Sequence, residues 1–527
     1  MQLIETDIAI VGASLGGVAA AWRAASSGRR VVLAAEFDWL GGQLTSQAVP
    51  PDEHRLIEMG GASSGYLALR AELRRRYLEH PDFVDNSAMT EGCNPGDGWV
   101  SRLCVEPALA AACIEDLLAP LVAGGSLQIL RRCRLASAQR EGRRIVSVQL
   151  RGVHGDAIEL RAPWFLDATD TGALLHTAGL PYRLGKEARS EFGEPDAPPH
   201  AAPGDQQPVT MVMALRRSRT PAPVVGAPPN YEAWRRYLLP HYGYPLFSEY
   251  IPGSGRGQAV RLPLFPSTPA GSELDLWRYR RVVCAHNWRS PREEVSLVNW
   301  AQNDYALHAL LDGDLAENAV VEAAGNLSLC LLHWLRTEAP RPDGGQGYPE
   351  LALAPDVTGT SDGLAQQVYV RESRRIVGLD CLAQGEIAAG ADPLAPAERA
   401  DGVGIAWYNM DIHPTVQSGH GVNASVRPFT LPLGSFIPRD ADNLIPACKN
   451  IGVTHLVNAA TRVHPAEWMA GEIAAVLAGF AFDSGHPLTR IHADPALVEQ
   501  LRRRLRAAGI PLSWDRDNLA RLSPLSH

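Results

Sequence analysis

The sequence predicts an α/β protein in which a parallel sheet with covering helices is assembled from separated segments. Residues 6–14 form a short apolar run that is typical of a buried parallel strand. The Ala-rich residues 16–28 follow as a helix that closes at a glycine, and residues 29–36 form a second buried strand. Together they make a βαβ unit of about 30 residues. A buried-strand pattern returns near residue 443 and a long Ala-rich helix near residue 466, so the same domain resumes late in the chain.

The segment between these two parts changes in its secondary-structure pattern and composition. Residues 105–123 have the apolar spacing of a helix, whereas residues 126–152 and 157–169 have strand patterns with a hairpin between them. Residues 185–208 are polar and rich in Pro and Gly, which predicts a loop or lid. Residues 209 to about 400 are rich in Trp, Tyr and Pro and lack a βαβ rhythm, so an inserted mixed α+β domain is expected. The predicted units are residues 1–180 and 401–485 for the first domain, 181–400 for the inserted domain and 486–527 for a C-terminal helical tail.

Composition excludes several classes of protein. A chain of 527 residues with a net charge of −9 is a poor partner for nucleic acid or an anionic membrane surface. The eight cysteines form no C-x-x-C pair, so we expect neither a zinc site nor a disulfide scaffold, and no metal is predicted. No secretory signal and no run of about 18 apolar residues is present, and a cytoplasmic location is expected. The sequence leaves the oligomeric state open.

The turn after the first strand has the features of a phosphate-binding site. Gly12 allows the tight turn and Gly17 lets helix and strand approach, while Gly16 adds backbone access. Ser14 stands where the G-x-G-x-x-G pattern has its second glycine, and its hydroxyl is a candidate donor to phosphate, next to Leu15. Glu36 ends the second strand, where an acidic side chain accepts hydrogen bonds from a ribose. These residues predict a Rossmann-like dinucleotide site.

Two further segments separate FAD from NAD. A second glycine pair just past the acidic residue, as in "FDWLGGQLT", resembles flavoproteins of the glutathione-reductase-like type, in which it runs beside the flavin. The segment "WFLDATDTGALLHTAG" resembles the stretch that brings a third strand against the ADP moiety in such proteins. The resemblance implies FAD as the cofactor. The additional contacts that it implies are Gly41, Gly42, Gln43, Thr45, Ala168 and Thr169.

Four longer motifs carry a family resemblance over nearly the whole chain. They are "GGQLT" at 41, "VRESRRIVG" at 370, "YNMDIHP" at 408 and "PACKNIGVTHLVNAATRVHPAEW" at 446. With them the chain resembles a family of FAD-dependent oxidoreductases. The resemblance implies a Rossmann-like FAD domain with a substrate domain over the flavin face. It also implies that Asn450, Ile451 and Gly452, after a buried strand, contact the flavin phosphate or ribityl group.

Candidate catalytic residues lie in the same motifs. Flavin oxidation of a C–H bond usually needs a base, and histidine is the natural one because its pKa lies near working pH. His413, His455 and His54 are therefore candidate bases or substrate ligands, with structural hydrogen bonding as the alternative for each. Arg371 is a candidate anion or flavin ligand, or a member of an ion-pair network with Glu372.

The predicted function is an FAD-dependent oxidoreductase that removes hydride from a small polar organic substrate such as an alcohol, sugar or amine. Dioxygen or another acceptor would reoxidise the flavin. One alternative is a flavin monooxygenase using NAD(P)H, which is disfavoured because no second clean nucleotide fingerprint appears. Another is an FAD-binding protein without catalytic activity, against which the histidines and arginines in the presumed cavity motifs count.

Overall fold

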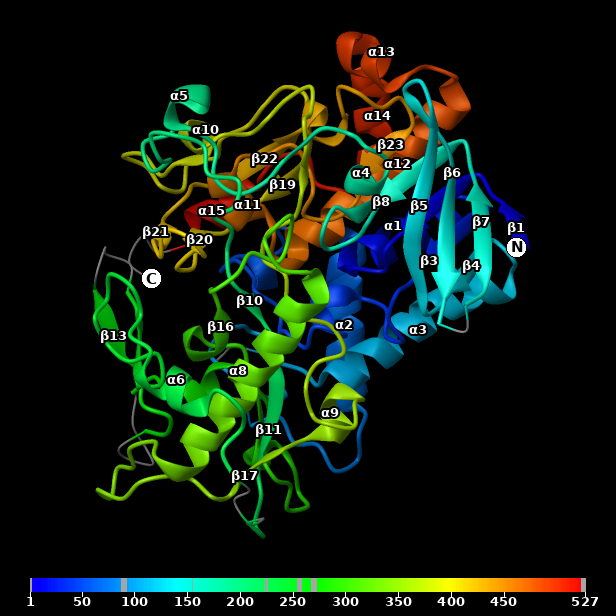
Figure 1. The fold of residues 1–527 in the computed structure, drawn as a ribbon. Coiled ribbons are helices and arrows are strands. Elements are labelled where there is room, and N and C mark those ends of the chain that lie inside the picture. The colour runs from blue at the N-terminus through cyan, green and yellow to red at the C-terminus, as the bar shows by residue number, and fades with distance from the viewer. Residues whose placement is uncertain are drawn as a thin grey trace.

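A five-stranded parallel sheet forms the centre of the first domain. The computed structural model describes residues 2–86, 92–153, 155–221, 223, 226–253, 258–266 and 273–522, and Figure 1 shows their arrangement. Four of its strands are buried on both faces, as expected when helices cover a parallel sheet, and the edge strand, residues 127–130, is partly exposed. Its order is β23 (Leu444–Pro446), β8 (Trp164–Asp167), β2 (Ile8–Val11), β3 (Val31–Ala34) and β4 (Leu127–Leu130). A strand from late in the chain thus completes the N-terminal sheet, and the predicted α/β fold built from separated segments is confirmed.

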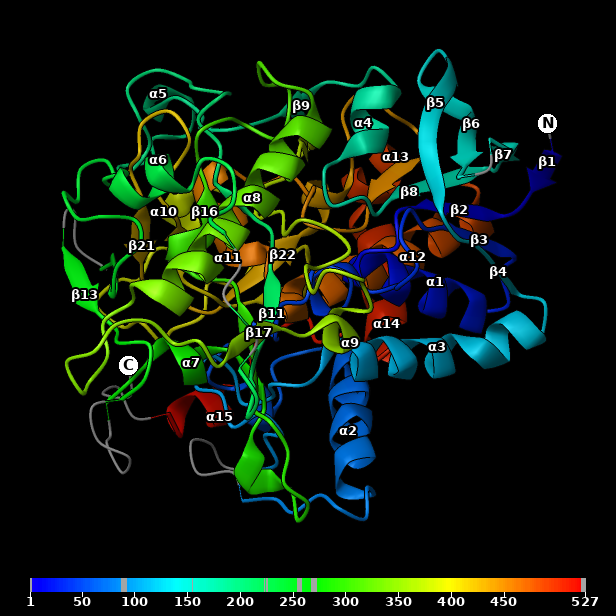
Figure 2. The same ribbon diagram turned by 60° about the horizontal axis from the view of Figure 1, so that its bottom comes forward.

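Two helices from opposite ends of the chain pack against each other beside this sheet (Figure 2). They are α1 (Leu15–Ser26) and α12 (His464–Ser484). Their backbones meet at two glycines: a Cβ on Gly471 would lie 1.9 Å from the carbonyl oxygen of Gly16. Only residues without side chains allow so close an approach. The third covering helix is α3 (Pro107–Ala123), with Pro107 at its first turn.

A second sheet extends the first domain. Strand β1 (Gln2–Glu5) pairs in parallel with β7 (Ala157–Arg161), and β7 continues into the antiparallel strands β6 (Arg144–Gly152) and β5 (Cys133–Glu141). The hairpin predicted between residues 126–152 and 157–169 is the antiparallel β6–β7 pair. The short helix α4 (Ala173–Thr177) follows β8 and packs near β5.

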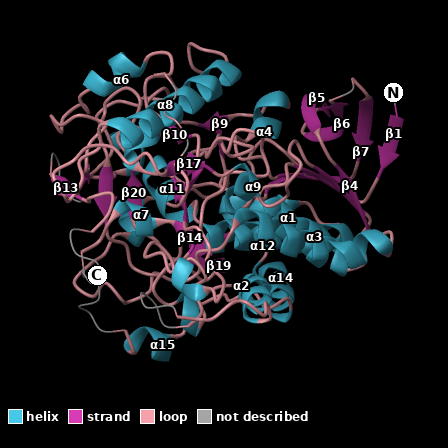
Figure 3. Cartoon of the chain, turned by 90° about the horizontal axis from the view of Figure 1, so that it is seen from below, coloured by secondary structure: helices cyan, strands magenta, loops and turns pink. Residues whose placement is uncertain are grey.

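The inserted region is built around an antiparallel sheet and one long helix. The sheet has the order β14 (Arg281–Val283), β15 (Val295–Val298), β11 (Met213–Arg217) and β17 (Leu351–Leu353). Helix α8 (Glu317–Thr337) runs beside this region, as Figures 1 and 3 show. The shorter strands are β9 (Tyr182–Arg183), β10 (Val209–Thr210), β12 (Tyr250–Pro252), β13 (Ala259–Arg261), β16 (Asp304–Tyr305), β18 (Arg375–Ile376), β19 (Gly402–Ala406), β20 (Met410–Ile412), β21 (Val422–Ala424) and β22 (Phe429–Pro432).

The remaining helices lie around these sheets. The predicted loop at 185–208 contains one short helix, α5 (Arg189–Phe192), and the C-terminal tail is helical as far as it is described. Among the described residues, no helix has both the length and the apolar character needed to cross a bilayer. The other helices are α2 (Ser64–Leu78), α6 (Tyr231–Arg236), α7 (Leu276–Tyr279), α9 (Pro355–Thr358), α10 (Gln384–Ile387), α11 (His455–Thr461), α13 (Leu488–Ala493), α14 (Pro495–Ala507) and α15 (Arg516–Ala520).

Candidate functional site

The turn between β2 and α1 is shaped by close contact with the end of β8. Gly12 has φ +98°, and a Cβ there would lie 2.3 Å from the carbonyl oxygen of Ala168, so no other residue fits without a shift of the backbone. Ser14 caps α1, because its hydroxyl accepts a hydrogen bond from the backbone N–H of Gly17 at 3.2 Å. A side-chain hydrogen bond also links that hydroxyl to Cys448.

A cavity of about 790 Å³ opens beside this turn, and we call it the glycine-loop cavity. Its wall includes Glu36, which follows β3, and Arg134, whose guanidinium lies 3.1 Å from the Glu36 carboxylate. The Glu36 side chain is about half exposed, which leaves its carboxylate accessible from the cavity. Five residues predicted from the sequence line the cavity: Gly12, Ser14, Glu36, Ala168 and Thr169.

The second glycine pair supports the turn from behind. The N–H of Gly41 donates to the carbonyl of Ala13 at 2.8 Å, and a Cβ on Gly42 would come within 2.9 Å of the Ser14 Cα. Gln43 reaches across to Glu467 of α12 at 2.6 Å, and Thr45 donates to the Leu40 carbonyl at 2.7 Å. These residues fix the loop in place, and none of them lines the cavity. The predicted contacts that lie outside the cavity wall are Leu15, Gly16, Gly17, Gly41, Gly42, Gln43, Thr45, Asn450, Ile451 and Gly452.

The segment after β23 uses its polar groups inside the protein. The Asn450 amide donates to the Asp167 carbonyl at 3.0 Å, and the N–H of Gly452 donates to the Ser435 carbonyl at 2.7 Å. Lys449 is fully buried and forms an ion pair with Asp170, which lines the glycine-loop cavity. Although burial opposes the charge, Asp170 holds the pKa of Lys449 well above its usual range. The segment thus places a permanent positive charge behind the cavity wall.

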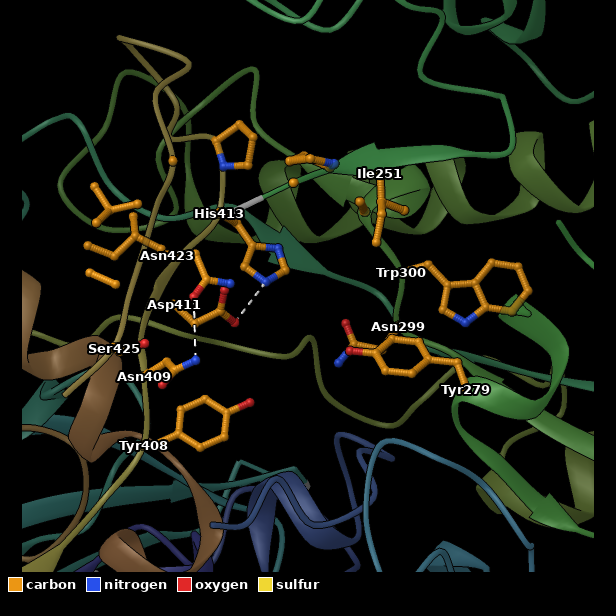
Figure 4. Close-up of a pocket in the computed structure, with 18 of the residues that line it drawn as sticks. Ile251, Tyr279, Asn299, Trp300, Tyr408, Asn409, Asp411, His413, Asn423 and Ser425 are labelled. Carbon is orange, nitrogen blue, oxygen red and sulfur yellow. Dashed lines mark hydrogen bonds and ion pairs between the residues drawn. The ribbon is translucent and has the colours of Figure 1, made fainter. Parts of the chain in front are cut away.

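A second cavity of about 790 Å³ lies on the inserted-domain side, and we call it the aromatic cavity. Figure 4 shows Tyr279, Asn299 and Trp300 on one wall, with His413 and Asp411 opposite them. The first three come from the region of β14 and β15, and the last two from β20 and the turn that follows it. The lining also includes further aromatic rings and two arginines: Trp99, Tyr242, Trp407, Tyr408, Arg55 and Arg280.

His413 is held between two carboxylates. Its Nδ1 lies 2.5 Å from Asp304 and its Nε2 lies 3.5 Å from Asp411. Burial and the charge of Arg371 lower the pKa of His413, but the two carboxylates outweigh them and the net pKa is raised. Asp304 stays ionised because Arg371 and His413 overcome its burial and lower its pKa to about 2. Of the three predicted catalytic histidines, only His413 both lines the aromatic cavity and contacts carboxylates.

Arg371 belongs to that network and lines neither cavity. It pairs with Asp304 at 2.8 Å and donates to Thr210 at 2.9 Å. In the extended segment around it, alternate residues face opposite sides. Val368 and Val370 line the glycine-loop cavity, whereas Arg371 faces the His413 cluster. One segment therefore connects the wall of one cavity with the charge network of the other.

The other two predicted histidines have different surroundings. His54 lines the aromatic cavity, with its Nε2 donating to the Gly61 carbonyl at 3.0 Å and its ring packed between Trp407 and Trp514. Burial lowers the pKa of His54 to about 4, so it is neutral at physiological pH. His455 lines neither cavity. It is the first residue of α11 and lies in a buried cluster, with its Nδ1 3.2 Å from the carboxylate of Glu372.

Three residues that the sequence reasoning did not single out contribute to the cavities. Arg134 pairs with Glu36 from the neighbouring strand β5, whereas Arg280 and Asn299 come from the ends of β14 and β15. The N–H of Leu297 donates to the carbonyl of Arg280 at 3.1 Å, so the two strand ends lie side by side. The motif "NWAQNDY" was a signal for this wall, and its Trp300 does line the aromatic cavity.

The parallel sheet with a glycine turn at a helix N-terminus defines a dinucleotide-binding protein of the Rossmann-like class. A family described as "FAD dependent oxidoreductase" matches residues 7–505, and the chain belongs to this family. The cofactor is FAD, and the protein is an FAD-dependent oxidoreductase. No curated protein matches the chain.

Three of the solved structures that match the chain, all with TM-scores below 0.5, are the following. The myxobacterial chondrochloren halogenase CndH is 12% identical with a TM-score of 0.34, covering 100% of this chain and 87% of that one. A geranylgeranyl bacteriochlorophyll reductase-like protein from Thermoplasma acidophilum is 11% identical with a TM-score of 0.33, covering 99% and 89%. For L-proline dehydrogenase from P. horikoshii the identity is 16% and the TM-score 0.19, and the chain spans only 23% of that protein.

The glycine-loop cavity has a donor set that fits FAD. A helix N-terminus and hydroxyls suit a pyrophosphate, and the carboxylate of Glu36 suits a ribose. The hydroxyl on the cavity wall is that of Ser14, since Thr169 donates its own to Asp167 at 2.7 Å, and the guanidinium of Arg134 adds a charged donor. A deeply buried amide beside the glycine pair is also without a hydrogen-bond partner among the described residues: both polar atoms of Gln47 are unsatisfied. The residues present therefore have the chemistry to hold the cofactor.

Proposed function

We propose that the protein oxidises a small polar organic substrate, an alcohol, sugar or amine, in the aromatic cavity, with His413 accepting the substrate proton. The observation that supports this most directly is the position of His413 on the wall of the aromatic cavity, beside Asp411 (Figure 4). Asp304 binds the other ring nitrogen from behind this wall. A polar cavity of this size with convergent charged groups is the expected form of a small-molecule site. FAD, when bound, accepts hydride from the substrate carbon.

The neighbours of His413 determine which nitrogen acts. Asp304 is ionised and can only accept a hydrogen bond, so the Nδ1 of His413 carries the proton and donates it. Asp411 is ionised as well and accepts from Nε2 of the imidazolium, so the lone pair of Nε2 is available to a substrate when the pH is above the raised pKa of His413. Once Nε2 takes a proton, both carboxylates stabilise the imidazolium cation. His413 thus acts as the base, and the two aspartates orient it and stabilise its charged form.

Arg371 acts through Asp304 and is a positioning residue. Its guanidinium binds Asp304, Thr210 and the carbonyl of Pro208, all within 2.9 Å, and it is buried. This pairing keeps Asp304 ionised and fixed toward His413. A charged, rigid support of this kind limits the motion of the base.

The proposal is tested by anaerobic reduction of the flavin in the holoenzyme. Benzyl alcohol, glucose and benzylamine are mixed with the protein and bleaching of the flavin is followed by absorbance. For any donor that bleaches the wild type, we expect His413→Gln to slow the reduction by about 10²–10⁴-fold. His420→Gln is a matched control, because His420 does not line the cavity. An unchanged reduction rate in His413→Gln with normal flavin content would exclude His413 as the base, and failure of every donor would contradict the proposed function.

A further inference from the structure

The aromatic cavity has an unusual set of buried polar atoms without partners. Among the described residues that line it, these atoms are Nε and Nη1 of Arg280, Nδ2 of Asn299, Nε1 of Trp300 and Nδ1 of His54. The atoms of the first three residues are all nitrogens that can only donate. His54 Nδ1 is the exception, because Nε2 donates to the Gly61 carbonyl and leaves Nδ1 as an acceptor. A buried donor without a partner costs about 1–3 kcal/mol, so a cluster of them points to a ligand rich in acceptors.

Arg280 is the centre of this cluster. Its side chain is only 7% exposed, and its one carboxylate contact is Nη2 to Asp52 at 3.3 Å. This contact uses Nη2 and leaves Nε and Nη1 without a partner among the described atoms. Nε and Nη1 lie on different edges of the guanidinium, each shared with Nη2, so each can donate to an acceptor oxygen next to the Asp52 contact. The ring of Tyr279 lies under the guanidinium at 4.8 Å and holds its plane in place.

The orientation of Asn299 is fixed by its other partner. The guanidinium of Arg371 donates to Asn299 Oδ1 at 3.2 Å, and an arginine has no acceptor atom. The amide oxygen is therefore identified, and the nitrogen Nδ2 is the atom without a partner. Because β14 and β15 are adjacent antiparallel strands, Arg280 and Asn299 present their donors from the same wall.

We propose that the substrate of the aromatic cavity carries a carboxylate, which is bound by Arg280 with Asn299 as a further donor. This proposal depends on one part of the proposed function, namely that the aromatic cavity is the substrate site. The rings of Trp99 and Tyr279 pack with centroids 4.3 Å apart on the cavity wall, and the rings of Trp300, Trp407 and Tyr408 line it as well, which suits a substrate that carries a ring. The substrate class is therefore a ring-bearing hydroxy acid or amino acid, oxidised at the carbon that bears the hydroxyl or amino group. The electron pair and one hydrogen leave that carbon as hydride to FAD, and His413 takes the proton from oxygen or nitrogen.

The test is a binding measurement on the oxidised holoenzyme, so no turnover is involved. Benzoate and benzamide are a matched pair of probes that differ in charge and not in shape. Each is titrated while the visible flavin spectrum and the tryptophan fluorescence are recorded. We expect benzoate to bind the wild type more tightly than benzamide, and Arg280→Gln to weaken benzoate by about tenfold or more with little effect on benzamide. Arg280→Lys keeps the charge but loses the flat edge, and we expect an intermediate loss.

Arg55→Gln is the control for a general effect of positive charge, because Arg55 also lines the cavity but lies over Trp407. Equal losses in Arg55→Gln and Arg280→Gln would overturn the proposal, as would equal binding of the two probes or no benzoate binding at all. If Arg280→Gln fails to retain flavin, Arg280→Lys decides: unweakened benzoate binding with normal flavin content overturns the proposal. Benzoate binding that persists in His413→Gln, together with unchanged flavin reduction in that variant, would remove the proposed base and keep the carboxylate site.

Discussion

At the scale of single residues, the charge network around His413 predicts the pH dependence of the reaction. The carboxylates of Asp304 and Asp411 raise the pKa of His413 above its ordinary value of 6.5. A base works only when it is deprotonated, so kcat/KM should be low below this raised pKa and increase as the pH passes through it. The contribution of His413 to folding stability has the opposite sign: it is fully present below pH 6.5 and is lost as the pH rises through the folded pKa.

Asp304→Asn tests this relation directly. Removing the nearer carboxylate leaves only Asp411 to oppose the burial and the charge of Arg371, both of which lower the pKa of His413. We expect the rise of kcat/KM to move to lower pH, by about 1–3 units, which is the usual effect of a close charge. A purely structural role for Asp304 would lower the rate without moving the midpoint of the pH profile. The pH profile of kcat/KM, corrected for the flavin content of each variant, therefore separates a structural role from an electrostatic one. A midpoint that stays in place would contradict the electrostatic role.

At the scale of elements, the crossing of α1 and α12 predicts a sharp difference between two glycines of one helix. A Cβ at position 471 would lie 1.9 Å from the backbone of α1, whereas a Cβ at position 479 meets no atom within 4 Å. Gly471→Ala should therefore destabilise the protein by about 1–3 kcal/mol or more through overpacking. Gly479→Ala should stabilise it by about 1 kcal/mol, because alanine is the better helix former. Urea unfolding of both variants checks this, and equal free energies of unfolding would contradict the close crossing.

Most of the nucleotide-binding elements could be predicted from the sequence, because each depends on a local pattern. The turn at Gly12 and the cap at Ser14 follow from residues within a few positions of one another, and both are found. The pairing of Asp304 with His413 joins residues 109 positions apart, and no local pattern encodes it. Arg280 and Asn299 likewise meet only because two antiparallel strands place their ends together. The cofactor turn was thus visible in the sequence, and most of the wall of the aromatic cavity was not.

At the scale of the whole molecule, FAD binding should stabilise the fold. The cofactor cavity takes its walls from β2, β3 and β8 and from residues 310–322 and 366–374, so a ligand there holds distant segments together. Free FAD at about 100 times its Kd should add about 2.7 kcal/mol and raise the Tm of the apoprotein. Glu36→Ala removes a half-exposed side chain whose ion-pair partner is Arg134. We expect an apoprotein Tm close to that of the wild type and a smaller increase with FAD; a full increase would rule out the ribose contact.

Among the described residues, the two cavities have no wall residue in common. One extended segment connects them: its Val370 lines the glycine-loop cavity and its Arg371 contacts the network around His413. The aromatic cavity is bordered by residues 53–55, parts of 242–301 and parts of 393–426, all outside the glycine turn. Under the proposed function, cofactor retention and choice of substrate depend on different stretches of chain. A chimera that exchanges the aromatic stretches for those of another member of the family should keep its yellow colour and acquire a new preference. Substitutions that change the substrate during evolution can likewise leave cofactor binding intact, because they alter residues on only one side of the 368–371 segment.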